Sequence, residues 1–335
     1  MKFKSLLLFC LGCSFFTAAA DTTRILFIGN SFTGNNDMPG IFQKISKAKN
    51  KVVHVEKCWK GGASLKDQTL RPELFAAIKK GNWDVVIVQG WSKEFVQKKE
   101  YIDTVTLPYA GMIIDTINTY NPCVQILFYE TWGYFNGCEM DSTQLTYEQM
   151  SDTIIKGYSY LKSVYNYPVV PVGSTWLSFR KKYPNINLYD TDLYHPSKLG
   201  SYLAASTFFT CIFHESPVGV TTKTISYSEA KLIQEHCEQT LLPKLENLGF
   251  TRNYFVLSAT KDEKGRYQLK AKAFYGEQAK ITWYVAKNKV FKGSELTYYY
   301  SAPGTYSVRL KVEEPCGTRW FSQKVTFKSK QSLKN

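Results

Sequence analysis

The chain has 335 residues, of which 44% are hydrophobic and 15% aromatic, and it carries a formal net charge of +14. It is too long for one ordinary core and too apolar for a disordered protein, so we expect two folded domains. Its lysines are scattered and no nucleic-acid-binding motif accompanies them, so we expect no nucleic-acid partner and interpret the charge as solubility with weak attraction to acidic polymers.

The first 20 residues have the pattern of a signal peptide. Two lysines precede an apolar run from Ser5 to Phe16 that is too short to span a bilayer, and Ala18-Ala19-Ala20 supplies a small-residue cleavage site. We therefore expect a mature chain that begins at Asp21 and is secreted or periplasmic, with the cell surface as a further location. A lipid anchor at Cys13 is an alternative, and no later apolar run is long enough to cross a membrane.

Short apolar runs alternate with helical segments over the next part of the chain. We predict strands at Arg24–Gly29, Val52–Glu56, Trp83–Gln89, Val124–Glu130 and Pro168–Val172. We predict helices at Pro39–Lys49, Leu74–Lys80, Tyr109–Tyr120, Gln149–Tyr165, Pro196–His214 and Ser228–Leu248, the last bent or broken at Pro243. Strands that alternate with helices predict a three-layer α/β/α domain with a mostly parallel sheet, over residues 21–248.

The pattern changes after Gly249. We predict short alternating strands at Tyr254–Ala259, Gln268–Tyr275, Lys280–Val285, Thr305–Val312 and Trp320–Phe327. These strands predict a small all-β sandwich domain over residues 249–335. The stretch APGTYSVRLKV at 302–312 resembles PKD and related immunoglobulin-like domains, which implies a spacer or interaction role. Glycan binding through Trp283, Trp320 or the tyrosines is the alternative.

Six cysteines follow the predicted cleavage site, an even number that permits disulfides in an oxidising compartment. Cys123–Cys138 is the first pairing that we expect, because the two residues flank one predicted strand and its loop. Cys211–Cys237, which joins two predicted helices, is the second, and buried free thiols are the alternative. The four histidines lack the spacing of a metal site, so we expect no metal and no other cofactor.

We expect the functional site at the carboxyl ends of the predicted strands, where open α/β sheets bind their ligands. Ser31 directly follows the first strand, and Gly29 allows a sharp turn that exposes the hydroxyl, so Ser31 is a candidate nucleophile if a base can reach it. Gly61-Gly62 follows the second strand and suits a backbone N–H donor for an oxyanion. Gln89 and Ser92 follow the third strand, where a side-chain donor to the same oxyanion is expected. Each residue taken alone also fits a turn or a helix cap.

Asp192 and His195 lie in the loop before the helix that starts at Pro196. An Asp and a His three residues apart in a turn can meet by local folding. The carboxylate then holds one ring nitrogen and leaves the other nitrogen to accept a serine proton. Asp190 is a rival to Asp192, at a poorer spacing.

The order of these residues resembles the four sequence blocks of the SGNH/GDSL esterases, over residues 24–245. LFIGNSFT at 26–33 is similar to the first block, and Asp192-x-x-His195 to the last. The third block departs from the family, because the usual Gly-x-Asn-Asp is absent; Gln89-Gly90-x-Ser92 is instead similar to a segment of carbohydrate O-acetylesterases. The resemblance implies catalysis by Ser31, His195 and Asp192, with an oxyanion hole of Ser31, Gly62 and Gln89, and Ser92 as the alternative to Gln89.

The resemblance implies an exported serine esterase that acts on a small-molecule or glycan ester, and we expect a carbohydrate O-acetylesterase. A lipase or a thioesterase is an alternative of the same class. A glycan-binding or surface protein with a degenerate hydrolase domain is an alternative of another class, and the irregular third block favours it. A fluorophosphonate probe separates the two classes, because only an activated serine reacts with it.

Overall fold

The computed structural model describes residues 22–140, 142–251, 254–275, 277–286, 289–315 and 317–327. The predicted signal peptide and the alternative anchor at Cys13 lie outside these described residues. Within the described ranges, no helix combines the length and the apolarity that crossing a membrane requires.

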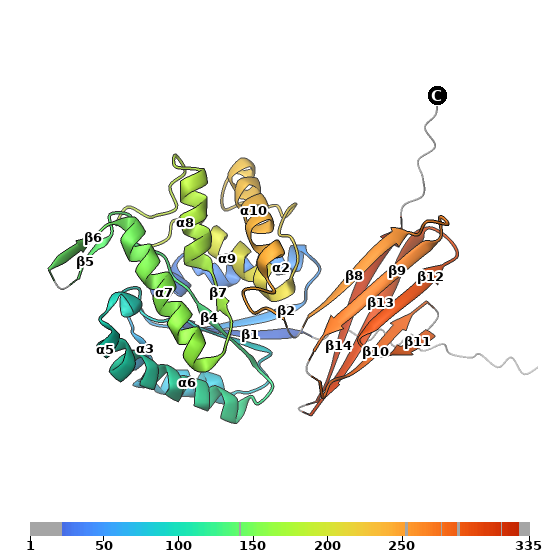
Figure 1. Ribbon diagram of the computed structural model, residues 1–335, viewed down its shortest axis with the longest axis horizontal. Helices are drawn as coiled ribbons and strands as arrows, with labels where there is room; N and C mark the ends of the chain where they lie inside the picture. Colours follow the sequence, from blue (N-terminus) through green and yellow to red (C-terminus); the bar gives the residue numbers. More distant parts are fainter. Residues whose placement is uncertain are drawn as a thin grey trace, which may run out of the picture.

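A five-stranded parallel sheet forms the centre of the larger part of the chain (Figure 1). Its order is β2-β1-β3-β4-β7, and the strands are β1 (Thr23–Gly29), β2 (Val53–Trp59), β3 (Val85–Val88), β4 (Gln125–Tyr129) and β7 (Val169–Val170). All four residues of β3 are buried, as a strand covered on both faces requires.

Helices cover both faces of this sheet, and each face has its own hydrophobic core (Figure 1). One layer contains α2 (Met38–Ala48), α8 (Val172–Lys182), α9 (Lys198–Phe213) and α10 (Tyr227–Leu241). The other contains α3 (Leu65–Thr69), α4 (Pro72–Lys79), α6 (Leu107–Tyr120) and α7 (Tyr147–Tyr165). Short elements link them: α1 (Ser31–Gly34), η1 (Asn35–Asp37), η2 (Glu94–Val96), α5 (Lys99–Tyr101), η3 (Ile102–Thr106), η4 (Leu242–Lys244), β5 (Cys138–Met140) and β6 (Thr143–Leu145).

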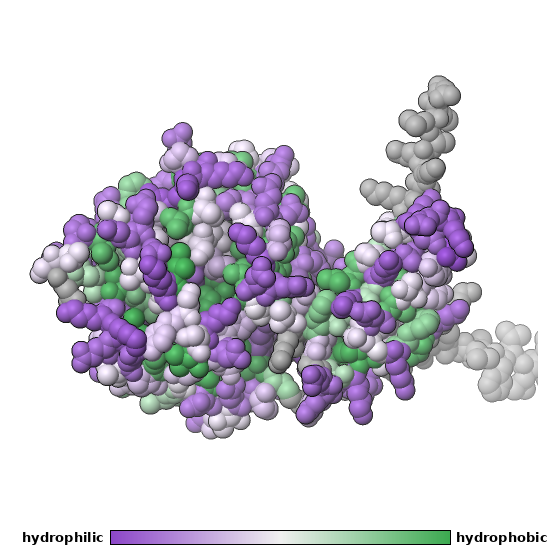
Figure 2. All heavy atoms as spheres, in the orientation of Figure 1, coloured by the Kyte–Doolittle hydropathy of each residue, from purple (hydrophilic) through white to green (hydrophobic). Residues whose placement is uncertain are grey.

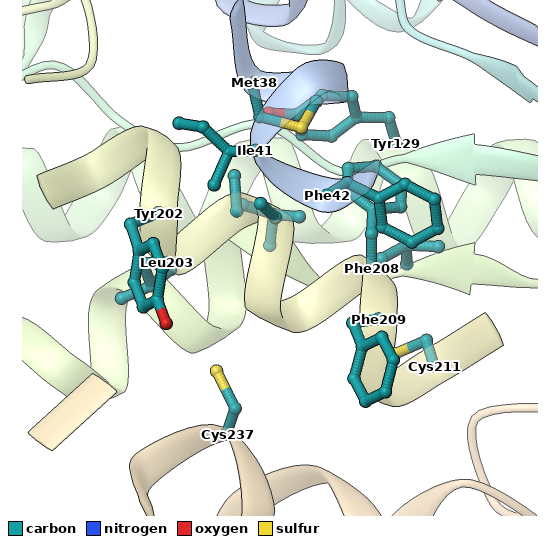
Figure 3. Close-up of a cluster of buried hydrophobic side chains, with 14 of the residues drawn as sticks. Met38, Ile41, Phe42, Tyr129, Tyr202, Leu203, Phe208, Phe209, Cys211 and Cys237 are labelled. Carbon is teal, nitrogen blue, oxygen red and sulfur yellow. The ribbon is translucent and has the colours of Figure 1, made fainter. Parts of the chain in front are cut away.

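Helix α9 is buried on all sides, which explains why its sequence is apolar all round. Phe208 packs edge-on against Phe27 of β1 and Tyr129 of β4, at 5.2 and 4.8 Å between ring centroids. Figure 3 shows that α9 presents Phe208 and Tyr202 to different neighbours, with α2 above it and Cys237 of α10 below. This helix therefore connects the sheet to the outer helices of its layer.

Both predicted disulfides are wrong. Cys138, Cys211 and Cys237 are free and buried, whereas Cys123 is disulfide-bonded to a residue other than these. The thiol of Cys237 lies 3.8 Å from Thr207 Oγ1, and Figure 3 shows it apart from Cys211. Burial raises the pKa of Cys237 to about 12, which keeps this thiol protonated and unreactive.

Some elements were not predicted, among them α3, α8 and the β5–β6 hairpin. The strand predicted at Pro168–Val172 is reduced to the two residues of β7, and α8 begins directly after it. The tight turn depends on Gly173, because a Cβ there would lie 1.9 Å from the carbonyl oxygen of Thr131. The connection between β7 and α8 is short and tightly packed, so the sequence there shows only weak helical periodicity.

The C-terminal part of the chain is a sandwich of two antiparallel sheets around a third core. One sheet contains β8 (Tyr254–Lys261), β9 (Tyr267–Phe274) and β12 (Glu295–Tyr300), and the other β10 (Lys280–Val285), β11 (Lys289–Lys292), β13 (Gly304–Glu314) and β14 (Gly317–Phe327). Trp283 is fully buried in this core and its Nε1 donates to the carbonyl oxygen of Gly293. Trp283 therefore cannot present its ring to a glycan, and glycan binding through Trp320 or the tyrosines stays a prediction.

The sandwich contacts the amino-terminal ends of the central strands (Figure 1). Arg319 of β14 lies 3.6 Å from Asp84, just before β3, and Tyr254 of β8 stacks on His214 at 3.5 Å between ring centroids. A cavity of about 610 Å³ lies between the two parts at this edge. Hydrophilic residues are spread over both parts on the face shown in Figure 2. The carboxyl ends of the strands lie at the opposite edge of the sheet.

Candidate active site

Ser31 is placed by a turn that only glycine allows. A Cβ on Gly29, the last residue of β1, would lie 2.4 Å from Thr33 Oγ1 and 2.5 Å from Gln89 Oε1. Asn30 then caps α1, because its side-chain oxygen accepts the N–H of Phe32 at 3.0 Å. Ser31 is therefore the first residue of α1, at the carboxyl end of β1, with its side chain half-buried.

The loop before α9 holds His195 through hydrogen bonds to Asp192. Asp192 Oδ1 accepts the N–H groups of Tyr194 and His195 at 3.1 and 2.9 Å, and Leu193 between them has a φ of +65°. Trp132 also holds this loop, since its Nε1 donates to the carbonyl oxygen of Tyr194 at 3.1 Å. The local turn thus fixes the direction of the imidazole.

Ser31, His195 and Asp192 form one hydrogen-bonded series across 164 residues of sequence. His195 Nε2 lies 2.8 Å from Ser31 Oγ, and His195 Nδ1 lies 2.6 Å from Asp192 Oδ2. Asp190 takes no part, because its carboxylate accepts the N–H of Thr191. An imidazole held in this way can take a proton from the hydroxyl and return it to a leaving group.

Asp192 is the charged member of the series. Burial alone would raise the pKa of its carboxyl, but the hydrogen bonds from the His195 ring and from the N–H groups of His195 and Tyr194 outweigh this effect and lower the pKa. The side chain of Asp192 is 37% exposed and that of His195 is 20% exposed, so solvent reaches this edge. A charged Asp192 favours the tautomer in which Nδ1 carries the proton and Nε2 accepts.

Two backbone N–H groups at the edge are free to bind an oxyanion. Gly62 lies in a turn after β2, where Ala63 N donates to Lys60 O, and has a φ of +68°. A Cβ on Gly62 would meet nothing within 4 Å, so the turn faces open space. Among the described residues, neither the Ser31 N–H nor the Gly62 N–H donates to a protein acceptor.

Gln89 does not supply the third donor that the sequence suggests. It is fully buried, and its amide nitrogen donates to Asn30 Oδ1 and to the carbonyl oxygen of Gly90, both at 2.7 Å. Its amide oxygen accepts from Thr33 Oγ1 at 2.6 Å and from Asn30 N at 3.2 Å. With both amide protons used, Gln89 has none for an oxyanion, and we correct that expectation.

Ser92, the alternative donor, is also engaged. Its hydroxyl shares a 2.7 Å hydrogen bond with Tyr134 OH, and its side chain is buried. The segment after β3 therefore contributes structure to this edge through Gln89 and Ser92. The described side chain that hydrogen-bonds to Ser31 Oγ from a distant part of the chain is that of His195.

Sequence reasoning missed two supporting residues, Asn30 and Trp132. Asn30 lies between a strand and a helix, and this position is the sequence signal for its capping role. Trp132 stacks on Phe32 at 4.4 Å between ring centroids, and nothing in its neighbourhood of the sequence indicates this contact. Among the described residues, no three His, Cys, Asp or Glu side chains converge as metal ligands would.

Comparison with known proteins places this geometry in a known fold. Residues 262–327 match the family model of the PKD domain. A DUF4886 family protein from Bacteroides uniformis ATCC 8492 superposes with a TM-score of 0.57 and 17% sequence identity, over 67% of this chain and 96% of that chain. A protein from Slackia heliotrinireducens assigned to the SGNH hydrolases superposes with a TM-score of 0.46 and 24% sequence identity, over 56% of this chain and 98% of that chain. An acetyl xylan esterase superposes with a TM-score of 0.45 and 14% sequence identity, over 57% of this chain and 100% of that chain. No curated protein matches the chain in sequence.

These findings establish a PKD domain and the fold of the part that precedes it. The superposition on the DUF4886 family protein, which is 17% identical, shows a shared fold. The structural neighbours include SGNH hydrolases and esterases, as the sequence resemblance suggested. The predicted α/β/α fold with a following β-domain is confirmed.

Proposed function

We propose that this chain is an exported serine ester hydrolase that releases acetyl groups from a polysaccharide or glycan. One observation carries the proposal: Ser31 Oγ lies 2.8 Å from His195 Nε2 while His195 Nδ1 lies 2.6 Å from Asp192 Oδ2. A hydroxyl, an imidazole and a carboxylate linked in this order can activate the hydroxyl as a nucleophile.

The proposed reaction has two halves. His195 Nε2 removes the hydroxyl proton as Ser31 Oγ attacks the ester carbonyl carbon, and the N–H groups of Ser31 and Gly62 bind the developing oxyanion. His195 then gives the proton to the leaving alcohol as the ester C–O bond breaks, which leaves the acyl group on Ser31. In the second half, water gives a proton to His195 as its oxygen attacks the acyl carbonyl carbon. The bond between the acyl group and Ser31 Oγ then breaks as His195 returns the proton to Ser31 Oγ, and the free acid leaves.

The choice of a carbohydrate substrate rests on three features outside the triad. They are the signal-peptide pattern, the PKD domain at 262–327, and the likeness of the Gln89–Ser92 segment to carbohydrate O-acetylesterases. Two aromatic side chains near the site support it. Trp59 at the end of β2 is 38% exposed, and Tyr194 beside His195 is 37% exposed. Their rings offer flat apolar faces with polar groups, which suit a sugar.

Labelling with a fluorophosphonate probe tests the nucleophile. We expect the wild-type protein to be labelled and Ser31→Ala to be unlabelled, with hydrolysis of an activated ester reduced by about 10³-fold or more. Ser92→Ala is the matched control and should stay labelled, because its hydroxyl is bonded to Tyr134. A wild-type protein that reacts no better than Ser31→Ala would favour the non-catalytic, glycan-binding alternative.

A substrate panel tests the acyl and alcohol parts. We expect acetate release from acetylated polysaccharides to exceed the hydrolysis of long-chain acyl esters and of acyl thioesters. Preference for long-chain esters would identify a lipase, and preference for thioesters a thioesterase. The same panel run with Ser31→Ala separates enzymatic from spontaneous release.

A further inference from the structure

A buried carboxyl group that the proposed mechanism does not use lies behind the two loops at the edge of the site. Glu94, the first residue of η2, is fully buried. Its Oε2 accepts the backbone N–H of Trp91 at 2.6 Å and that of Leu65 at 3.3 Å. Leu65 is the first residue of α3, directly after the loop that contains Gly62, and Trp91 lies in the loop after β3. A single side chain therefore bonds to both loops.

The same two loops are also held from the side of Ser31. Asn30 Nδ2 lies 3.4 Å from the carbonyl oxygens of both Ala63 and Gly90. On the Glu94 side the packing is close, because a Cβ on Gly90 would lie 2.8 Å from Glu94 Oε2. The loop that carries the Gly62 N–H is thus fixed between two polar side chains, Asn30 and Glu94, which approach it from different directions.

We propose that Glu94 is a positioning residue for the oxyanion site: by binding the N–H groups of Leu65 and Trp91, it fixes the loop that carries the Gly62 N–H against the loop after β3. The term oxyanion site rests on the proposed function, whereas the connection between the loops is independent of it. An oxyanion donor acts only when it is held in place before the reaction, so a displaced Gly62 N–H slows the chemical step more than it weakens substrate binding.

The charge of Glu94 determines how firmly it holds the two loops. An ionised carboxylate accepts N–H bonds more strongly than a neutral acid does. Burial raises the pKa of Glu94 to about 7, and the N–H groups of Trp91 and Leu65 limit that rise. The titratable groups that face it are Asp67 on α3, Tyr101 on α5 and Tyr158 on α7, none of which is a cation. Protonation in mild acid therefore weakens both bonds.

Glu94→Gln tests the proposal, and Glu130→Gln is its matched control. Glu130 is also buried with a pKa raised to about 7, but it binds the N–H and hydroxyl of Ser174 at 2.6 and 2.7 Å. We would measure kcat and KM on p-nitrophenyl acetate between about pH 5 and about pH 9. For Glu94→Gln we expect kcat to fall about tenfold with KM changed less than about twofold, since losing a whole oxyanion donor costs about 10²–10³.

The loss of activity at low pH distinguishes a positioning role of Glu94 from a general loss of structure in the variant. In the wild-type and Glu130→Gln proteins the protonation of Glu94 should add to the loss of activity in mild acid, and in Glu94→Gln this contribution should be absent. An unchanged kcat in Glu94→Gln, or an equal loss of kcat in Glu130→Gln, would overturn the proposal.

Amide hydrogen exchange tests the connection between the loops without activity. In Glu94→Gln the N–H groups of Leu65 and Trp91 should exchange faster, while those of β1 keep their protection. The same two amides of the wild-type protein should lose protection in acid relative to β1, which covers the case in which the variant does not fold. Unchanged exchange would refute the proposal. If turnover is independent of Ser31 but exchange changes as expected, the proposed function fails and the role of Glu94 in holding the loops stands.

Discussion

At the scale of single residues, Asn30 and Gln89 together form the framework under Ser31. Asn30 Oδ1 accepts from Phe32 N and from the Gln89 amide, and Gln89 in turn accepts from Thr33 Oγ1 and Asn30 N. All these groups are buried, where an unpaired polar group is costly. Gln89, which follows β3, therefore holds the backbone that carries Ser31, and both of its amide protons are donated to groups within the protein.

Replacing Gln89 by methionine tests this framework. Gln89→Met keeps the shape of the side chain but removes the acceptor of the Asn30 N–H and of the Thr33 hydroxyl. Since each buried unsatisfied group costs about 1–3 kcal/mol, we expect the free energy of unfolding to fall by about 2 kcal/mol or more. Urea denaturation measures the change. Gln144→Met, at an exposed position on β6, is the control and should change stability by less than about 0.5 kcal/mol. Equal stability of the two variants would contradict this account.

At the scale of elements, the segment that contains Glu94 is held by its contact with α7. Phe95 packs on Tyr158 at 4.2 Å between ring centroids, and it crosses α7 at Gly157. A Cβ on Gly157 would lie 2.4 Å from Phe95 Cβ. The glycine thus permits η2 to approach the helix closely enough to place Glu94 behind the two loops.

Gly157→Ala should therefore destabilise the protein although alanine is the better helix former. The alanine gains about 1 kcal/mol in helix propensity, but overpacking against Phe95 costs about 1–3 kcal/mol and shifts η2. We expect a net loss in the free energy of unfolding, measured by urea denaturation, together with faster amide exchange at Trp91. Lys156→Ala, exposed on the same helix, is the control. A stabilised Gly157→Ala protein would show that η2 can move away without cost.

At the scale of the whole molecule, buried titratable groups act in opposite directions on stability. Burial raises the pKa of Glu94 and Glu130 from 4.5 to about 7, so the folded state holds extra protons in that range and stability falls as pH rises through it. Burial lowers the pKa of His214 and His236 from 6.5 to about 4, so stability falls as pH drops through that range. The two effects oppose each other between about pH 4.5 and about pH 6.5.

Glu130→Gln separates one of these contributions. The glutamine oxygen can still accept from Ser174 but carries no charge, so the variant avoids the cost of ionising a buried carboxyl. We expect its free energy of unfolding relative to wild type to increase with pH, by up to about 1.4 kcal/mol per pH unit between about pH 5 and about pH 7. Denaturation at a series of pH values measures this. Glu139→Gln, exposed on β5, should show no such trend. A difference that is constant with pH would mean that Glu130 titrates normally.

The two parts of the molecule meet far from the candidate site. The sandwich contacts the amino end of β3 through Arg319 and the end of α9 through Tyr254, whereas Ser31, Gly62 and His195 lie at the carboxyl ends of the strands or in the loops there. The sandwich therefore lies away from the hydrogen-bonded series of Ser31, His195 and Asp192.

The sequence by itself determined those features that depend on local order. Alternating strands and helices predicted the α/β/α fold, and strand-end positions singled out Ser31, Gly62 and the Asp192–His195 turn. The glycine turn and the Asp-x-x-His loop are each made by neighbours in the chain, so their residue types carry the signal.

Only the tertiary structure decided which polar groups meet across the fold. The orientation of Gln89 depends on Asn30, 59 residues away, and the role of Glu94 depends on Leu65, 29 residues away. The cysteine pairing likewise depends on how helices and loops face one another. Such contacts are set by the packing of elements from distant parts of the chain, so patterns of neighbouring residues do not predict them.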